Sequence, residues 1–255
     1  MKTEIWAHRG ASRDVPENTM AAFEKACADG ADGLEIDVQR TKDGELVVFH
    51  DEQLERLTGD PRQLKDLTRK KLHALRVAGA HDIPLFSDVL AFCKERKLRL
   101  NIELKNSVHL YPGLEEQAAE LVRAAGIPAD RIIYSSFHHP SMRKMKTIVP
   151  EASVGLLYAG ILYAPWNYAK ALGADALHPM INSLQMPDFV RGCHDTGLRV
   201  HTWTADEDAH ILAALALGAD AVITNVPAHA VRLRESFRKD PAACRPVLKE
   251  LGLEG

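Results

Sequence analysis

The stretch Gly30-Ala-Asp-Gly-Leu-Glu-Ile-Asp-Val38 decides the fold, because it joins the end of one helix to a strand that carries two acids. Gly30 suits the left-handed conformation that ends a helix, and the apolar residues that follow predict a strand over 33–38. Side chains alternate faces along a strand, so Glu35 and Asp37 point to the same side. Two buried carboxylates repel each other and are costly to desolvate. A divalent cation bound by oxygen ligands is the simplest partner for them.

The phrase Gly-Ala-Asp occurs three times, at 30–32, 173–175 and 218–220, each time between an alanine-rich stretch and an apolar one. We interpret each copy as a helix-to-strand corner that belongs to the scaffold. Outward from these corners the sequence predicts eight strands, at 4–8, 33–38, 98–104, 131–136, 153–158, 176–179, 199–204 and 221–226. Amphipathic stretches separate most of the strands, such as 18–29, 85–96, 114–125, 186–196 and 206–217.

Eight repeats of strand and helix in a chain of this length predict an α/β fold, the (β/α)8 TIM barrel. A doubly wound open sheet is the alternative, although no Gly-x-Gly-x-x-Gly pattern follows the first strand. The alternation breaks at 43–82, which contains a short strand at 45–49 and a helical piece around 68–75. We interpret 43–82 as a small cap inserted after the second strand, above the end of the barrel where active sites form. We expect one domain over 1–255, with a tail at approximately 239–255.

Composition and charge exclude several classes of protein. The formal net charge of −3 and the pI of about 6.5 give no footprint for nucleic acid or for an anionic membrane. No apolar run of 18 residues predicts a membrane-spanning helix, and no apolar anchor stands out in the sequence. The four cysteines are far apart and lack metal-ligand spacing, which indicates reduced thiols. With no signal-like segment, we predict a cytoplasmic protein, either a monomer or a homo-oligomer.

Reactive side chains gather at the predicted C-terminal ends of the strands, where barrel enzymes place their active sites. These residues are His8, Arg9, Glu35, Asp37, His50, Glu103, Lys105, His178 and Trp203. A structural network of ion pairs is the alternative interpretation of the carboxylates and cations, but it leaves the two histidines at positions 8 and 50 unexplained. A pair of histidines on adjacent elements favours acid–base catalysis.

Other candidates have structural interpretations. We expect His178 and His201 to be wall or core residues of the barrel, and His138-His139 to be a capping and surface pair at the start of a helix. Trp203 either plugs the mouth of the barrel or forms an aromatic wall for a sugar or glycerol moiety.

The charges narrow the chemistry. The site would combine three carboxylates with one divalent cation and the side chains of Arg9 and Lys105. The sum of these charges suits an anion of low charge. Arginine offers a fork of donors and lysine a point charge, and both suit phosphate oxygens. These groups are the components of phosphate-ester cleavage. A metal polarises a phosphoryl oxygen, one histidine accepts a proton, and the other histidine donates one.

A series of short motifs occurs in order along the chain. They are His8-Arg9-Gly10, Pro16-Glu-Asn-Thr19, Ala22-Phe23, Gly30-Ala-Asp32, Leu34-Glu-Ile-Asp-Val38, Thr41-Lys-Asp-Gly44, Val47-Val-Phe-His-Asp51, Asp66-Leu-Thr68, Ile83-Pro84, Ile102-Glu-Leu-Lys105, Ser135-Ser-Phe137 and Trp203-Thr204. Together they closely resemble the glycerophosphodiester phosphodiesterase family, in its bacterial cytoplasmic form, over roughly residues 4–227.

The resemblance implies a barrel with an insertion after strand two, and hydrolysis of glycerophosphodiesters, such as glycerophosphocholine, to an alcohol and sn-glycerol 3-phosphate. The implied residues are His8 and His50 for acid–base catalysis, Glu35, Asp37 and Glu103 for one divalent cation, Mg²⁺ or Ca²⁺, and Arg9 and Lys105 for the phosphate. The implied route uses the neighbouring glycerol hydroxyl as nucleophile and passes through a cyclic phosphate. One departure is Thr224-Asn-Val-Pro227, where the family often has Thr-Asp before a proline; we expect it to change only fine details of the rim.

Two further functions stay open at this point. A glycoside hydrolase also uses carboxylates at a barrel rim, but it does not require two histidines with an arginine and a lysine. A non-catalytic phosphoester-binding barrel needs only the cationic groups, so the presence of both His8 and His50 favours an enzyme.

Overall fold

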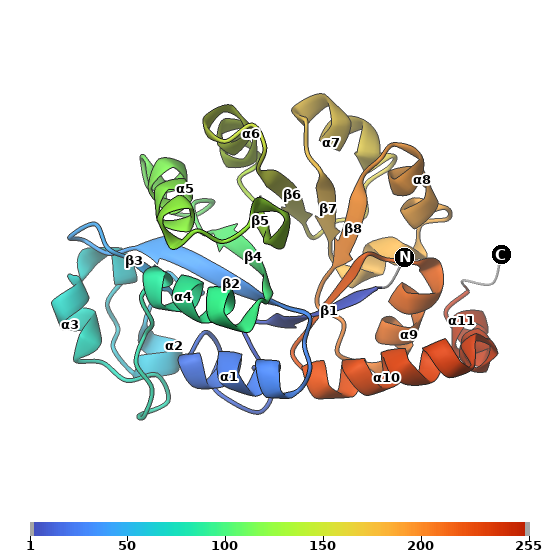
Figure 1. The fold of residues 1–255 in the computed structure, drawn as a ribbon, viewed down its shortest axis with the longest axis horizontal. Coiled ribbons are helices and arrows are strands. Elements are labelled where there is room, and N and C mark those ends of the chain that lie inside the picture. Colours follow the sequence, from blue (N-terminus) through green and yellow to red (C-terminus); the bar gives the residue numbers. More distant parts are fainter. Residues whose placement is uncertain (1–2, 253–255) are drawn as a thin grey trace.

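A computed structural model describes residues 3–252 and shows a closed barrel of eight parallel strands (Figure 1). The strands are β1 (Glu4–His8), β2 (Gly33–Arg40), β4 (Arg99–Leu104), β5 (Ile132–Ser136), β6 (Ser153–Tyr158), β7 (Ala176–Pro179), β8 (Arg199–Thr202) and β9 (Ala221–Thr224). Strand β1 pairs in parallel with both β2 and β9, and these two pairings close the barrel. The predicted TIM barrel is confirmed.

Helices follow most of the barrel strands and cover the outside of the barrel. They are α1 (Met20–Ala28), α4 (Phe86–Arg96), α5 (Leu114–Ala125), α6 (His139–Ile148), α7 (Pro165–Leu172), α8 (Phe189–Asp195), α9 (Asp208–Leu217) and α10 (Pro227–Lys239). The short 3₁₀ turns are η1 (Leu64–Asp66), η2 (Ala129–Arg131), η3 (Ile181–Gln185) and η4 (Pro241–Cys244), and α11 (Arg245–Glu250) lies in the predicted tail. Residues 1, 2 and 253–255 of the predicted domain lie outside the described residues. No helix in the described part of the chain is long and apolar enough to span a bilayer.

Alternation along β2 separates the core from the site. Leu34, Ile36 and Val38 belong to the large apolar cluster between the barrel and its helices. The residues between them therefore turn their side chains to the barrel interior. Glu35 and Asp37 are both buried there, as the strand pattern predicts.

The three Gly-Ala-Asp corners have the predicted conformation. Their glycines have φ of 82°, 85° and 80°, at Gly30, Gly173 and Gly218 respectively. The aspartate of each corner accepts a hydrogen bond from a strand N–H, Asp32 from Ile5, Asp175 from Val154 and Asp220 from Val200. The repeated phrase thus attaches each corner to an adjacent strand and is part of the scaffold.

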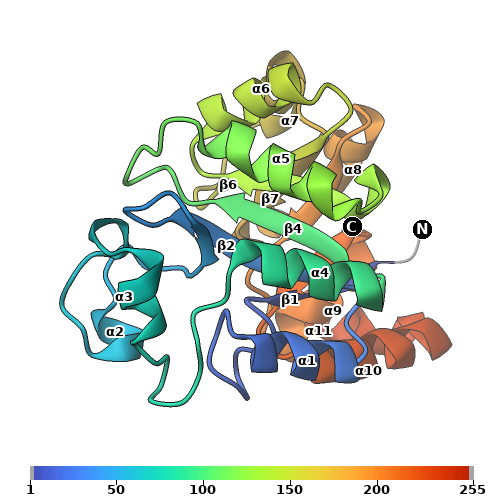
Figure 2. The same cartoon turned by 60° about the vertical axis from the view of Figure 1, so that its left-hand side comes forward.

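The predicted insertion forms a cap beside the barrel (Figure 2). It contains β3 (Leu46–Val48), which pairs antiparallel with β2, followed by α2 (Glu55–Thr58), η1 and α3 (Arg69–His73). The cap has its own apolar cluster of eight buried residues, which are Val47, Phe49, Leu54, Leu64, Leu67, Leu72, Val77 and Ile83. Since His50 follows β3, the cap positions one of the two histidines predicted to act in catalysis.

Candidate active site

A cavity of about 190 Å³ lies at the C-terminal ends of the barrel strands. It is lined by His8, Arg9, Glu35, His50, Asn101, Glu103, Phe137, Leu157, Trp203 and Ile223. Six of these are predicted site residues, so the structure brings most of the predicted rim group into one cavity. One part of the lining is charged or polar, and the other part is aliphatic and aromatic.

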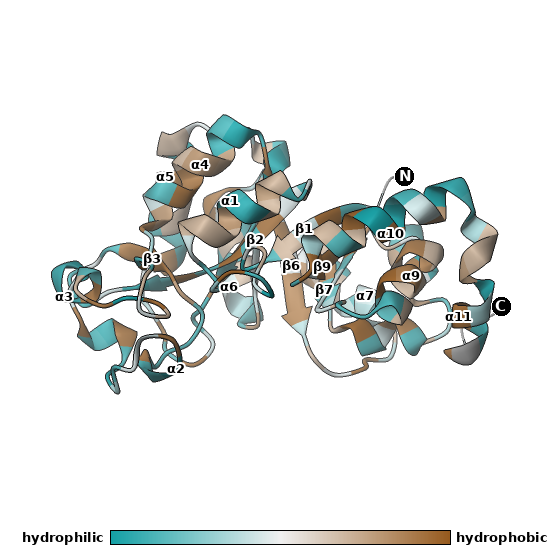
Figure 3. Ribbon diagram, turned by 90° about the horizontal axis from the view of Figure 1, so that it is seen from below, coloured by the Kyte–Doolittle hydropathy of each residue, from teal (hydrophilic) through white to brown (hydrophobic). Residues whose placement is uncertain are grey.

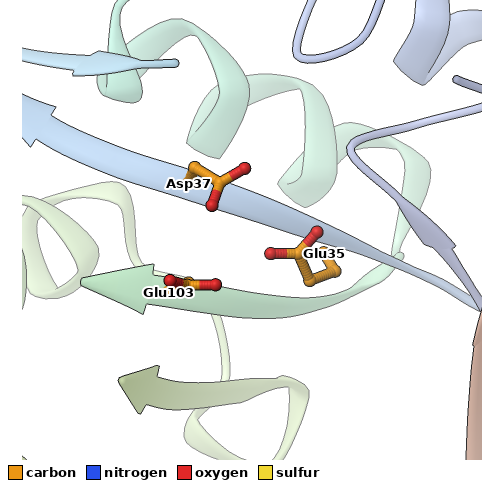
Figure 4. A group of neighbouring side chains, drawn as sticks. All are labelled: Glu35, Asp37 and Glu103. Atoms are coloured by element: carbon orange, nitrogen blue, oxygen red, sulfur yellow. The ribbon is translucent and has the colours of Figure 1, made fainter. Parts of the chain in front are cut away.

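Three carboxylates converge beside this cavity. Glu35, Asp37 and Glu103 are buried, and each offers an oxygen within 4.8 Å of the other two (Figure 4). The arrangement follows from strand pairing, because Asp37 lies opposite Glu103 in the register of β2 and β4. Asp37 Oδ1 is buried and accepts no hydrogen bond. A buried carboxylate oxygen without a donor, next to two other carboxylates, fits a hard divalent cation.

Two cations border the carboxylates on opposite sides. Arg9 Nε lies 3.3 Å from Asp37 Oδ2, and its backbone N–H donates to Glu35 Oε2 at 3.1 Å. Lys105 Nζ lies 3.0 Å from Glu103 Oε1 and 3.7 Å from Asp37 Oδ1. The five charged groups sum to about −1 when all are ionised, which leaves a net negative centre for a cation.

The carboxylates differ in the direction of their pKa shifts. Burial, together with the charges of Asp37 and Glu103, raises the pKa of Glu35 well above its ordinary value. Burial also raises the pKa of Glu103, although Lys105 acts in the opposite direction. Burial alone would raise the pKa of Asp37, but Arg9 and Lys105 outweigh it and hold this pKa below its usual range. Asp37 is therefore the permanently ionised member of the group.

His8 is held in one orientation by Asn225. Its Nδ1 lies 2.8 Å from Asn225 Oδ1, and its Nε2 lies 3.9 Å from Glu35 Oε2. The amide of Asn225 donates through Nδ2 to Asp206, which turns its oxygen toward His8. Nδ1 of His8 is therefore the protonated nitrogen, and Nε2 carries the lone pair when the ring is neutral. Burial and the neighbouring Arg9 lower the pKa of His8 to about 4.

His50 is attached to the barrel through a chain of ion pairs. Its Nδ1 lies 2.7 Å from Asp51 Oδ1. Arg56 Nε donates to Asp51 at 2.6 Å, and its NH2 donates to Glu17 at 2.7 Å. Glu17 also accepts from Arg9 at 2.9 Å. The chain connects the cap, which positions His50, to the loop after β1, which carries Arg9.

Trp203 lies just beyond β8 rather than inside the predicted strand 199–204, because β8 ends at Thr202. Its indole Nε1 donates to the carbonyl oxygen of His178 at 2.8 Å. Its ring meets Phe137 edge to face, with centroids 5.6 Å apart. The two rings form an apolar, aromatic part of the cavity wall, whereas the carboxylates form a charged part.

The structure corrects the placement of His178. It was predicted at the rim, but it lies inside the barrel, where its Nε2 meets Nδ1 of His201 at 2.9 Å. Both rings are buried, in agreement with the prediction of core residues, and His201 packs on Trp6. Gly155 leaves the space for His178, because a Cβ atom there would come within 2.2 Å of its ring.

The prediction that His138-His139 starts a helix is confirmed, because His138 is the N-cap residue of α6, but the pair does not cap it through a side chain. His138 precedes α6, but its side chain makes no capping hydrogen bond; instead its Nδ1 lies 3.0 Å from Ser141 Oγ. His139 Nε2 donates to the carbonyl oxygen of Leu157 at 2.9 Å, and its Nδ1 lies 3.0 Å from Tyr168 Oη. Both histidines are half-buried, so they contribute to packing more than to the surface.

Three asparagines of the site have no role in the sequence predictions. Asn18 donates to Asp37 Oδ2 at 2.8 Å, Asn225 contacts His8, and Asn101 lines the cavity. The expectation that the Thr224-Asn departure concerns only fine details of the rim is wrong, because Asn225 contacts a predicted catalytic residue. The motif Pro16-Glu-Asn-Thr19 was a usable signal for Asn18, whereas the contact of Asn225 joins residues 217 positions apart.

Comparison with known proteins identifies the family. The sequence profile described as "Glycerophosphoryl diester phosphodiesterase family" matches residues 8–229. This chain belongs to that family. A glycerophosphodiester phosphodiesterase of Caldanaerobacter subterraneus subsp. tengcongensis is 38% identical over 91% of this chain and 98% of its own length. One of Bacillus altitudinis is 38% identical over 92% of this chain and its whole length.

Solved structures of glycerophosphodiester phosphodiesterases share the fold. An Oleispira antarctica phosphodiesterase, in complex with the product sn-glycerol-3-phosphate, superposes with a TM-score of 0.82 at 26% identity, over 92% of this chain and 97% of that chain. A glycerophosphodiester phosphodiesterase of Agrobacterium tumefaciens superposes with a TM-score of 0.78 at 26% identity, over 90% and 99% of the two chains. The chain is thus an enzyme of the glycerophosphodiester phosphodiesterase family, as its motifs predict.

Proposed function

We propose that the protein hydrolyses glycerophosphodiesters to an alcohol and sn-glycerol 3-phosphate, with a divalent cation, Mg²⁺ or Ca²⁺, and acid–base catalysis by His8 and His50. The main support is one juxtaposition, in which Glu35 and Glu103 line the same cavity as both histidines. The product bound to the Oleispira antarctica relative supports the choice of product. A glycosidase would have no use for this combination of carboxylates, imidazoles and basic side chains.

The donor set supports the cation. Glu35, Asp37 and Glu103 would hold it, and Asp37 Oδ1 supplies an oxygen that no protein donor occupies. When bound, the cation supplies charge stabilisation for a phosphoryl oxygen and favours the ionised form of all three carboxylates. Arg9 and Lys105 then lose part of their attraction to these carboxylates and are free to donate to the other phosphate oxygens.

The two histidines differ in the group that orients each ring. His8 is fixed by the neutral amide of Asn225 and presents the lone pair of Nε2, so we assign it the role of first proton acceptor. His50 is held through Nδ1 by the carboxylate of Asp51, which orients the ring at the edge of the cavity. We assign His50 the role of proton donor to the leaving alcohol.

The proposed route has two steps. In the first, the glycerol hydroxyl next to the phosphate loses its proton to His8, its oxygen bonds to phosphorus, and the alcohol leaves with a proton from His50. In the second, the histidines exchange roles, and water opens the cyclic phosphate to sn-glycerol 3-phosphate. The site accelerates both steps by proton transfer at fixed positions and by charge stabilisation.

An assay of released glycerol 3-phosphate tests the proposal, with glycerophosphocholine and glycerophosphoethanolamine as substrates. We expect activity that EDTA removes and that Mg²⁺ or Ca²⁺ restores. His50→Ala should lower kcat by about 10²- to 10⁴-fold while substrate affinity stays nearly unchanged. His73→Ala is the matched control, because His73 is an exposed histidine of the same cap. Full turnover in His50→Ala would exclude the acid–base assignment.

The cyclic route has its own test. A single turnover in H₂¹⁸O with rapid quenching should reveal the cyclic phosphate before glycerol 3-phosphate appears, and a synthetic cyclic phosphate should itself be hydrolysed. Direct displacement by water predicts no cyclic species and no turnover of the synthetic compound. That outcome would refute the route but leave the hydrolase assignment intact.

A further inference from the structure

Exposed apolar side chains gather around the mouth of the barrel. Seven large hydrophobic residues are exposed within residues 3–252, and six of these lie on the loops that follow β4, β5 and β6. They are Val108 and Leu110 after β4, Phe137 after β5, and Ile161, Leu162 and Tyr163 after β6. The loops are neighbours, because the three strands pair in this order. Scattered apolar residues are ordinary on a surface, whereas a group of them marks a contact site.

The loop after β6 contributes most to this apolar group. Its three consecutive residues 161–163 are all exposed, and Tyr163 is 96% exposed, so almost none of its ring is packed against the protein. The loop projects from the barrel on the same side as the cap helices α2 and α3 (Figure 3). Phe137 is both exposed and part of the cavity wall, so the apolar group extends from the outer rim to the active site.

The cap adds positive charge to the same side of the molecule. Segment 64–76 carries five cations and one acid, which are Lys65, Arg69, Lys70, Lys71, Arg76 and Asp66. Lys70 and Lys71 are exposed on α3, and neither takes part in an ion pair within the described residues. Lys65 and Leu110 line the same surface hollow, together with Lys42 and Asp43, so the basic segment and the apolar loop after β4 border one another. This local positive charge contrasts with the overall charge of −3.

We propose that this face docks on an anionic lipid surface, with the side chains of 161–163 inserted at the interface and the cap lysines against the headgroups. Aliphatic residues next to an exposed tyrosine suit the boundary between acyl chains and water, and unpaired lysines suit anionic headgroups. An acidic partner protein would also account for the lysines, but three consecutive exposed apolar residues that end in a tyrosine match the interfacial position that tyrosine takes at a bilayer. The docking requires no spanning helix, and it orients the mouth of the active site toward the lipid.

Vesicle sedimentation tests the proposal with the full chain. Wild-type protein should bind vesicles of equimolar phosphatidylglycerol and phosphatidylcholine, and should bind pure phosphatidylcholine vesicles much less. Ile161→Ser/Leu162→Ser/Tyr163→Ser should weaken partitioning by at least about tenfold, since burial of even one such side chain corresponds to about that factor. Lys70→Glu/Lys71→Glu should reduce vesicle binding more at low salt than at high salt, because salt screens the attraction between the lysines and the headgroups.

The control matches the charge change of the lysine variant. Arg238→Glu/Lys239→Glu alters two exposed cations at the end of α10, far from the loops after β4 to β6, and should bind vesicles like the wild type. All variants should keep the wild-type melting temperature and activity on soluble glycerophosphocholine, which separates this proposal from the catalytic one. No binding by the wild type, or equal loss in the α10 control, would overturn the docking proposal.

Discussion

The two ends of the barrel interior place polar side chains in opposite ways. At the C-terminal end, the carboxyl groups of Glu35 and Asp37 lie close together, and Arg9 contacts both of them. Toward the other end, His178 and His201 are kept neutral, with burial as the main cause of their lowered pKa values, and their rings pack edge to face and share one hydrogen bond. The same barrel therefore concentrates charge where a ligand enters and avoids it where packing alone is required.

Removing a carboxylate should test the functional end most strongly. Glu35→Gln or Asp37→Asn should weaken metal binding and lower activity by at least about 10²-fold, because a neutral amide is a poor ligand for a hard cation. Calorimetric titration with Mg²⁺ and Ca²⁺ checks the binding, and the activity assay follows at saturating metal.

Glu35→Gln should also leave the metal-free protein as stable as the wild type or more stable, by about 1 kcal/mol. The reason is that the fold raises the pKa of Glu35, so ionised Glu35 opposes folding at neutral pH. Urea unfolding in EDTA measures this effect. A large loss of stability would mean that the carboxylates form a structural ion network instead of a metal site.

Removing the Asn225 side chain that orients His8 should have the next largest effect on activity. Asn225→Ala removes the acceptor that fixes the ring, so kcat should fall by about 10- to 100-fold with little change in KM. Equal kcat in the alanine variant and the wild type would contradict the positioning role of Asn225.

The neutral histidine pair, His178 and His201, should make the stability of the protein depend on pH. The pKa of His178 is lowered to about 3, so the unfolded chain binds the proton more readily between this value and about 6.5. Stability should therefore fall as the pH is lowered from 7.5 to 5, and His178 alone should account for about 2 kcal/mol of that fall. Urea unfolding of His178→Gln at the two pH values should show a correspondingly smaller loss. An unchanged pH dependence would contradict the neutral pair.

The ion-pair chain between cap and barrel should have the smallest effect. The side chain of Arg56 is 49% exposed, so Arg56→Ala should reduce the free energy of unfolding by no more than about 1 kcal/mol. The activity should fall a few-fold, because His50 loses part of its attachment to the barrel. Arg62→Ala is the matched control and should leave activity unchanged, because Arg62 lies in the same cap and, within residues 3–252, its ion pair is with Asp60 alone.

The sequence predicts the barrel because its signals are local. The Gly-Ala-Asp corners and the alternation in β2 depend only on residues close together in the sequence. Both can therefore be predicted without knowledge of the rest of the fold. The convergence of Glu35 with Glu103 also follows, since adjacent parallel strands bring their C-terminal residues together.

The parts that the sequence does not predict depend on contacts between distant residues. The bond between His8 and Asn225, and the placement of His178 below the rim, arise only when the barrel closes. The apolar loops were missed for a similar reason. Residues 161–163 look in the sequence like the apolar residues of a strand, and only the fold shows that they are exposed and that Val108 lies on a neighbouring loop.

The division of labour between cap and barrel has an evolutionary consequence. The three carboxylates come from β2 and β4 alone, whereas His50 is supplied by a segment that has its own apolar cluster. Substitutions between residues 52 and 82 that keep Arg56 can therefore change the surroundings of His50 without altering the two strands that carry the carboxylates.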